Sequence, residues 1–160
     1  MVRKEIRTIY KYGGMNGSSS SAATASVVKP GGTAIMWDVN WSSRIIENGQ
    51  DLHKLGRWSY ITINGRGTSK LFIIKLYRCY KVQRSNTAGL NTSYMQQELL
   101  LQKTGRKQVH QDAALIDLGK FINKKKEEGN EILICIDANE AMDDKNSKIR
   151  EFVSLETEIR

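Results

Sequence analysis

The segment that most constrains the fold is EILICI at 131–136, an apolar run near the end of the chain. Such runs are typical of strands covered on both faces, because a half-exposed strand alternates apolar and polar residues. The run leads into Asp137-Ala138-Asn139. Residues two apart in an extended chain point the same way. We therefore predict a central, doubly covered strand that projects the Asp137 and Asn139 side chains together from its end.

Two further strands are expected earlier in the chain. Residues Trp58 to Asn64 read WSYITIN, which alternates with the period of two of a half-buried strand. Residues Lys70 to Tyr80 contain LFIIKLY, and Gly65-Arg66-Gly67 supplies a tight connection between the two runs. This pattern predicts an antiparallel hairpin. We expect EILICI to lie beside its second strand.

The remaining elements are expected from periodicity, caps and turn residues. They are a helix over Val2–Tyr10, a flexible loop over Gly13–Ser26, strands over Thr33–Trp37 and Val39–Ile46, a turn over Glu47–Gly56, a helix over Tyr94–Lys103, a helix from an Asp112 N-cap to a Gly129 C-cap, and a last helix capped by Asn146 or Ser147. The order indicates a mixed α/β fold. We divide the chain into an N-terminal helix and loop, 1–29, and a domain over 30–160.

The charge balance bears on the class of partner. The chain carries a formal net charge of +8. Lys and Arg displace the counterions condensed on nucleic acids, so a basic surplus favours phosphate-bearing partners. A protein with many surface lysines and no such partner has the same composition, and charge alone does not separate the two.

The cysteines and the apolar runs bear on location. Cys79 and Cys135 each lie in an apolar stretch without zinc-site spacing, which predicts buried free thiols in a reducing compartment. The first residues lack the apolar core of a signal peptide, and no apolar run is long enough to span a bilayer. We therefore expect an intracellular protein without membrane contact.

The candidate catalytic residues follow the two strongest strands. At one strand end, Asp137 could orient a water or bind a hard cation, and Asn139 offers a donor and an acceptor to a phosphate. At the other, Tyr77 and Arg78 are good phosphate donors if they face a cleft. Two plainer interpretations stay open: Asp-x-Asn forms a turn, and Tyr77 packs while Arg78 is on the surface.

Basic residues outside the strands suggest a nucleic-acid contact. Lys103, Arg106 and Lys107 lie in or beside a glycine-containing loop that could touch a phosphate backbone. A solvated loop would have the same composition. The run Lys124-Lys125-Lys126 is interpreted as the exposed part of a helix.

Four stretches together resemble the endonuclease/exonuclease/phosphatase family. In chain order they are PGGTAIMW at 30–37, GRWSYITI at 56–63, KLFIIKLYRCY at 70–80 and NEILICIDANEA at 130–141. The last is similar to the family's strand ending in Gly-Asp-x-Asn, with Ile136 in place of the Gly. PGGT, GRWS and the Gln96-Gln97 helix resemble most the endonucleases of LINE-type retrotransposons, which are related to abasic-site DNA endonucleases.

The resemblance implies a four-layer α/β sandwich and Mg²⁺-dependent attack of water on a phosphodiester of DNA. By that analogy Asp137 would orient or deprotonate the water, and Asn139 would contact the phosphate or the shell of the Mg²⁺. Tyr77 or Arg78 would stabilise charge that develops on the phosphate oxygens.

The sequence also departs from the family pattern at both ends. The family has an Asn and a metal-binding Glu upstream of the PGGT-like strand and an Asp-His pair near its end, and neither is recognisable here. We therefore expect a partial, truncated domain of retroelement origin with little or no activity. The alternatives are a basic nucleic-acid-binding module on the same scaffold and a phosphoesterase for a non-nucleic-acid substrate. Strands missing from the sheets would leave unpaired edges, so we also expect self-association.

Overall fold

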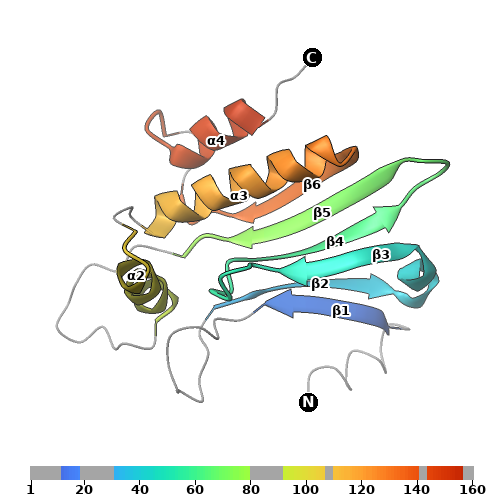
Figure 1. The fold of residues 1–160 in the computed structure, drawn as a ribbon, viewed down its shortest axis with the longest axis horizontal. Coiled ribbons are helices and arrows are strands. Elements are labelled where there is room, and N and C mark those ends of the chain that lie inside the picture. Colours follow the sequence, from blue (N-terminus) through green and yellow to red (C-terminus); the bar gives the residue numbers. More distant parts are fainter. Residues whose placement is uncertain (1–11, 19–30, 80–91, 107–109, 141–143, 157–160) are drawn as a thin grey trace.

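The structure, a computed structural model, describes residues 12–18, 31–79, 92–106, 110–140 and 144–156. It is a mixed α/β fold with two sheets and several helices (Figure 1). The strands are β1 (Tyr12–Ser18), β2 (Thr33–Asp38), β3 (Ile45–Gln50), β4 (Trp58–Asn64), β5 (Lys70–Tyr77) and β6 (Asn130–Asp137). The helices are the 3₁₀ helix η1 (Val39–Arg44), α2 (Ser93–Lys103), α3 (His110–Glu127) and α4 (Lys148–Glu156).

The larger sheet has the strand order β3-β4-β5-β6. β4 and β5 pair antiparallel from Trp58 opposite Leu76 to Asn64 opposite Lys70, which confirms the expected hairpin. β6 lies beside β5, also as expected, and the two strands run parallel. A parallel neighbour requires a crossover, and the segment containing α2 and α3 supplies it.

The core lies between this sheet and the helices. Phe72, Ile74 and Leu76 of β5 are fully buried, and they cluster with Leu118 and Ile122 of α3. The spacing of two in the strand and of four in the helix places each set on one face. Figure 1 shows α3 running along the sheet, with α4 beyond it.

The small sheet packs on the face of β4 that points away from the helices. β1 and β2 pair antiparallel. Thr33 Oγ1 donates a hydrogen bond to Ser59 Oγ at 2.9 Å, and Asn16 Nδ2 donates to the carbonyl of Tyr60 at 2.9 Å. Ser59 alternates with Trp58 along β4, so its side chain projects from the opposite face. The described residues therefore form a helical layer, a four-stranded sheet and a two-stranded sheet.

Three expectations for the first half of the chain are wrong in whole or part. Gly13 to Ser18 belong to β1 and are not a loop. Val39 to Arg44 form η1 instead of a strand, because Asp38 caps it: its Oδ1 accepts a hydrogen bond from the backbone N–H of Asn40 at 2.9 Å. β3 occupies part of the expected turn over 47–56. The helix expected over 2–10 lies outside the described residues.

The expectation that EILICI forms a central, doubly covered strand is also wrong. β6 is at the edge of the described sheet, and alternate residues along it are exposed. Leu133 is 47% exposed, and Cys135 is exposed as well, which corrects the expectation of two buried thiols. Cys79 is buried, and burial raises the pKa of its thiol to about 11.

Most helix ends follow the sequence signals, but the expected Asp112 N-cap is wrong, because α3 begins at His110 and Asp112 lies in its first turn. α2 is capped by Thr92, whose Oγ1 accepts a hydrogen bond from the N–H of Met95 at 3.2 Å. Ser147 caps α4 through Arg150 N–H, and Gly129 after α3 has the expected positive φ of 77°. No helix among the described residues is long and apolar enough to cross a membrane.

Lys125 is buried, although the sequence predicted an exposed run. Its ammonium group contacts the carboxylates of Glu47 at 2.8 Å and Glu128 at 2.9 Å. It also lies 5.6 Å from the ring centroid of Phe72 and 5.9 Å from that of Phe121. Its aliphatic stem can cover the apolar core while its charge is paired, which a run of three lysines does not reveal.

Candidate phosphate-binding site at the ends of strands β5 and β6

Tyr77 and Asp137 lie side by side at the carboxyl ends of parallel strands. They are direct partners in the β5–β6 register. The ladder continues one step further, where the N–H of Arg78 donates to the carbonyl of Asp137 at 2.9 Å. The Asp137 side chain is exposed, and Tyr77 is half-buried. The structure therefore brings these two candidate residues together at an edge where open sheets commonly place their sites.

Asn139 reaches the same edge, but its amide holds the turn closed. Its φ is +50°, in the left-handed region that Asn tolerates better than most residues. Its Nδ2 donates a hydrogen bond of 2.7 Å to the carbonyl of Arg78. The turn and the candidate site therefore share Asn139, and this donor is engaged within the chain.

Arg78 joins β5 to the start of α4. Its side chain is 5% exposed, and its Nη1 forms an ion pair with Glu140. The other Glu140 oxygen accepts a hydrogen bond from the N–H of Lys148 at 3.0 Å. Arg78 is thus not a surface residue, and its Nη1 links the end of β5 to the start of α4 through Glu140, whereas its buried Nε has no hydrogen-bond partner among the described residues.

Gly31 and the start of α2 lie next to Tyr77. A Cβ on Gly31 would be 2.2 Å from Ser93 Oγ and 3.7 Å from Cε1 of Tyr77. Gly31 also has a φ of +76°, so both space and backbone conformation favour glycine there. Neither Gly31 nor Ser93 was predicted as a site residue, and the signal in the sequence that points to this turn is Pro-Gly-Gly at 30–32.

The surroundings of Tyr77 suit the donation of a hydrogen bond from its phenol to an anion. Burial raises the pKa of Tyr77, and the nearby Cys79 and Asp137 raise it further. The phenol is therefore protonated at neutral pH and can donate. The amino-terminal end of an α-helix carries partial positive charge and favours anions, and α2 begins at Ser93.

The three basic candidates have different surroundings. Lys103 is exposed at the end of α2. Arg106 donates two hydrogen bonds to the Asp117 carboxylate at 2.8 and 2.9 Å. Lys107 lies outside the described residues. Of the three, Lys103 is therefore the one whose charge the described structure leaves exposed to a ligand.

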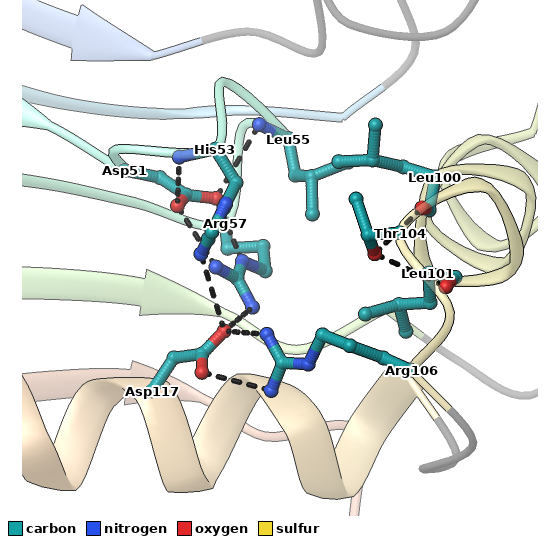
Figure 2. Close-up of polar contacts among 9 residues, drawn as sticks. All are labelled: Asp51, His53, Leu55, Arg57, Leu100, Leu101, Thr104, Arg106 and Asp117. Carbon is teal, nitrogen blue, oxygen red and sulfur yellow. Dashed lines mark hydrogen bonds and ion pairs between the residues drawn. The ribbon is translucent and has the colours of Figure 1, made fainter.

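A buried polar network lies behind this edge of the sheet (Figure 2). Arg57 donates to both Asp51 oxygens at 2.7 and 2.9 Å and to Asp117 at 2.8 Å, and its guanidinium lies 4.4 Å from the Trp58 ring centroid. The carbonyl of Arg57 accepts the N–H of Tyr77 at 2.8 Å. The network therefore fixes the backbone that positions Tyr77. No sequence signal paired Arg57 with Asp117, because 60 residues separate them.

Asp117 makes the stability of this network dependent on pH. Burial alone would raise the pKa of Asp117, but hydrogen bonds from Arg106 and Arg57 outweigh burial and lower it.

The lowered pKa of Asp117 predicts how stability depends on pH. A depressed folded-state pKa gives stability that is present above the unfolded-state value of about 3.9 and is lost as pH falls through the folded-state pKa. We expect thermal stability to fall as the pH drops below about 4, and to fall less in Asp117→Asn, when melting is followed from pH 7 downward. Parallel losses in both proteins would contradict this.

At the ends of β5 and β6, Asp137 is the residue that could contribute a carboxylate to Mg²⁺. Mg²⁺ in proteins is usually held by one or two carboxylates together with substrate phosphates and waters. Asp137 offers one exposed carboxylate, whereas Glu140 is engaged by Arg78 and Lys148. Within 12–18, 31–79, 92–106, 110–140 and 144–156, no three His, Cys, Asp or Glu side chains form a group that could hold a metal ion. Asp137 would therefore hold Mg²⁺ only together with a substrate phosphate and waters.

Comparisons with known protein families, with curated proteins and with solved structures gave no match.

Proposed function

We propose that this chain is part of an endonuclease/exonuclease/phosphatase-type domain with a four-layer sandwich fold. In this proposal the domain binds DNA phosphates at the carboxyl ends of β5 and β6, and it hydrolyses the phosphodiester bond slowly or not at all. The observation that carries the proposal is the pairing of Tyr77 with Asp137 at the ends of adjacent parallel strands. The four motifs that resemble the family supply the second support.

Phosphate binding is the part of the proposal that the contacts favour most. The ring of Tyr77, whose phenol is protonated, and Ser93 at the amino-terminal end of α2 both lie beside Gly31. Lys103 adds an exposed positive charge, and the chain as a whole carries +8. Contacts of this kind position a nucleic-acid backbone and carry no sequence information, so the expected binding is non-specific.

Efficient cleavage is the part that the contacts favour least. An exposed carboxylate such as Asp137 could orient a water molecule. However, Asn139 Nδ2 donates to the carbonyl of Arg78 and Arg78 Nη1 pairs with Glu140, so each residue spends part of its hydrogen-bonding capacity within the chain. Removing one member of a catalytic unit usually lowers the rate by orders of magnitude. This favours the alternative of a non-catalytic DNA-binding module on the same scaffold; a phosphoesterase for another substrate is the third candidate.

The first experiment measures cleavage. We expect the purified chain not to nick supercoiled plasmid or cleave an abasic duplex above background with Mg²⁺ or Mn²⁺. The matched control is Asp137→Ala, because Asp137 is exposed and its removal leaves the core intact. Metal-dependent cleavage that Asp137→Ala abolishes would replace the weak-activity proposal with an active nuclease. Cleavage that survives the substitution would come from another site or a contaminant.

The second experiment measures DNA binding by fluorescence anisotropy across a salt series. Each phosphate contact contributes about −0.9 to the slope of log affinity against log salt for duplex DNA. We expect Lys103→Ala to reduce this slope by about 0.9 and Tyr77→Phe to weaken binding without changing it. Lys124→Ala is the charge-matched control, because Lys124 is exposed in the last turn of α3. Equal effects of the two lysine substitutions, or no binding at low salt, would contradict the proposed site.

A further inference from the structure

The outer edge of β6 has no neighbouring strand in the described part of the chain. β5 pairs with one side of β6, and β6 is the last strand in the order β3-β4-β5-β6. An unpaired edge presents a row of backbone donors and acceptors, which is a template for another strand. β6 is eight residues long and lacks proline and lysine, and its charged residues, Glu131 and Asp137, lie only near its ends, so the middle of the strand carries none of the features that usually block such pairing.

A groove beside this edge can receive the side chains of an added strand. It has a volume of about 720 Å³ and lies between β6 and α4. Ile132, Ile134 and Ile136 line it from the strand, and Ile149 and Phe152 line it from the helix. A strand that pairs with β6 would direct every second side chain into this apolar groove.

The other face of β6 sets a stricter requirement on the partner. Leu133 is 47% exposed at the middle of the strand, and Glu131 and Asp137 are exposed near its ends. Directly opposite side chains interact most strongly, and like charges there are destabilising. A partner strand must therefore place an apolar residue opposite Leu133 and no carboxylate opposite the two acids.

We infer that the partner is β6 of a second copy, running antiparallel about a two-fold axis at Leu133. In this register Leu133 lies opposite its own counterpart, Glu131 opposite Cys135, and Asp137 opposite Gly129. The groove-facing residues then meet one another, because each keeps its face in a two-fold arrangement. A second β6 thus places an apolar residue opposite Leu133 and no carboxylate opposite Glu131 or Asp137. The two four-stranded sheets join into one.

Two other registers each fail on one of these requirements. An axis at Ile134 would place Glu131 directly opposite Asp137, so two like charges would meet on each side. An axis at Cys135 would place Leu133 opposite Asp137 and leave the apolar side chain against a carboxylate. The axis at Leu133 alone avoids both contacts among these three.

The first test is the molar mass of the chain in solution, by sedimentation equilibrium. We expect a dimer whose dissociation constant rises at least about tenfold in Leu133→Lys, because two ammonium groups would meet at the axis. Leu52→Lys is the matched control, since Leu52 is 82% exposed in the turn between β3 and β4, and it should leave the dimer unchanged. A monomeric wild type, or a dimer insensitive to Leu133→Lys, would overturn the inference.

The second test fixes the register without depending on a destabilising substitution. Opposite residues in an antiparallel pair have Cα atoms about 4.5–5.5 Å apart, within the range that a disulfide spans. The double variant Leu133→Cys with Cys135→Ser should therefore form a covalent dimer under mild oxidation, whereas Leu52→Cys with Cys135→Ser should not. The buried Cys79 should not interfere. A folded Leu133→Cys variant, checked by circular dichroism, that does not cross-link would refute this register.

Discussion

Replacing Arg57 with Ala is expected to lower the free energy of unfolding by about 3–5 kcal/mol, the typical cost of removing one partner from a buried ion pair. The Arg57 side chain is 1% exposed and the Asp51 side chain 0%, so the substitution leaves a carboxylate in the interior without its cation. Asp51 Oδ1 and Oδ2 also accept the N–H groups of His53 and Leu55, so the turn before β4 depends on the same carboxylate. Urea unfolding followed by circular dichroism measures this loss.

Two matched variants separate the buried pair from the rest of the network. Arg106 also pairs with Asp117, but it is 24% exposed, and Asp117 keeps Arg57 when Arg106 is removed. We expect Arg106→Ala to cost about 1 kcal/mol, as for a well-formed exposed pair. Arg57→Lys should lie between the two, because a lysine keeps the charge but cannot bind Asp51 through two nitrogens. A loss in Arg57→Ala no larger than in Arg106→Ala would contradict the role assigned to Arg57.

The sequence predicted those parts of the fold that depend on neighbouring residues. The β4–β5 hairpin follows from two strand-like runs joined by a short glycine-containing segment, and both signals are local. Helices α2 and α4 and the Gly129 C-cap were equally readable, because caps and periodicity lie within a few residues of each other.

Burial at the edge of the sheet could not be predicted in the same way. EILICI has the composition of a doubly covered strand, but whether a strand is covered depends on elements elsewhere in the chain. In the described structure the small sheet lies against β4 and β5, and β6 retains an exposed face with Leu133 and Cys135. The contacts within the described chain therefore leave some apolar side chains of β6 exposed to solvent. This is the physical basis of the dimer inferred above.

The sequence predicted where the candidate site lies on the sheet, but not which contacts its side chains make. Adjacent parallel strands end at the same edge, so the meeting of Tyr77 and Asp137 followed from the strand assignment. The engagement of Arg78 by Glu140 and of Asn139 by the Arg78 carbonyl depends on how the chain turns after β6. Pairs that are 61 or 62 residues apart leave no mark in local sequence.

Phe72 is expected to be the most sensitive apolar position of β5. Its side chain is fully buried, and its ring lies 5.2 Å from the ring centroid of Tyr60 and 5.7 Å from that of Phe121. The Lys125 ammonium lies 5.6 Å from the same ring, so the aromatic cluster also supports the one buried lysine described on α3. Truncation to Ala removes the ring and leaves a cavity, because packed interiors relax only partly. The Lys125 ammonium also loses its contact with the ring.

We therefore expect Phe72→Ala to lower the free energy of unfolding by about 3–5 kcal/mol, and Phe72→Leu, which keeps most of the volume, by less than about 1.5 kcal/mol. Ile46→Ala is the control, because Ile46 on the opposite edge strand β3 is 50% exposed and should change stability by no more than about 0.5 kcal/mol. Chemical unfolding of the three variants measures the differences. If Phe72→Ala costs no more than Ile46→Ala, then β5 does not pack against α3 as described. The positions assigned to Tyr77 and Arg78 at the end of that strand would then fail with it.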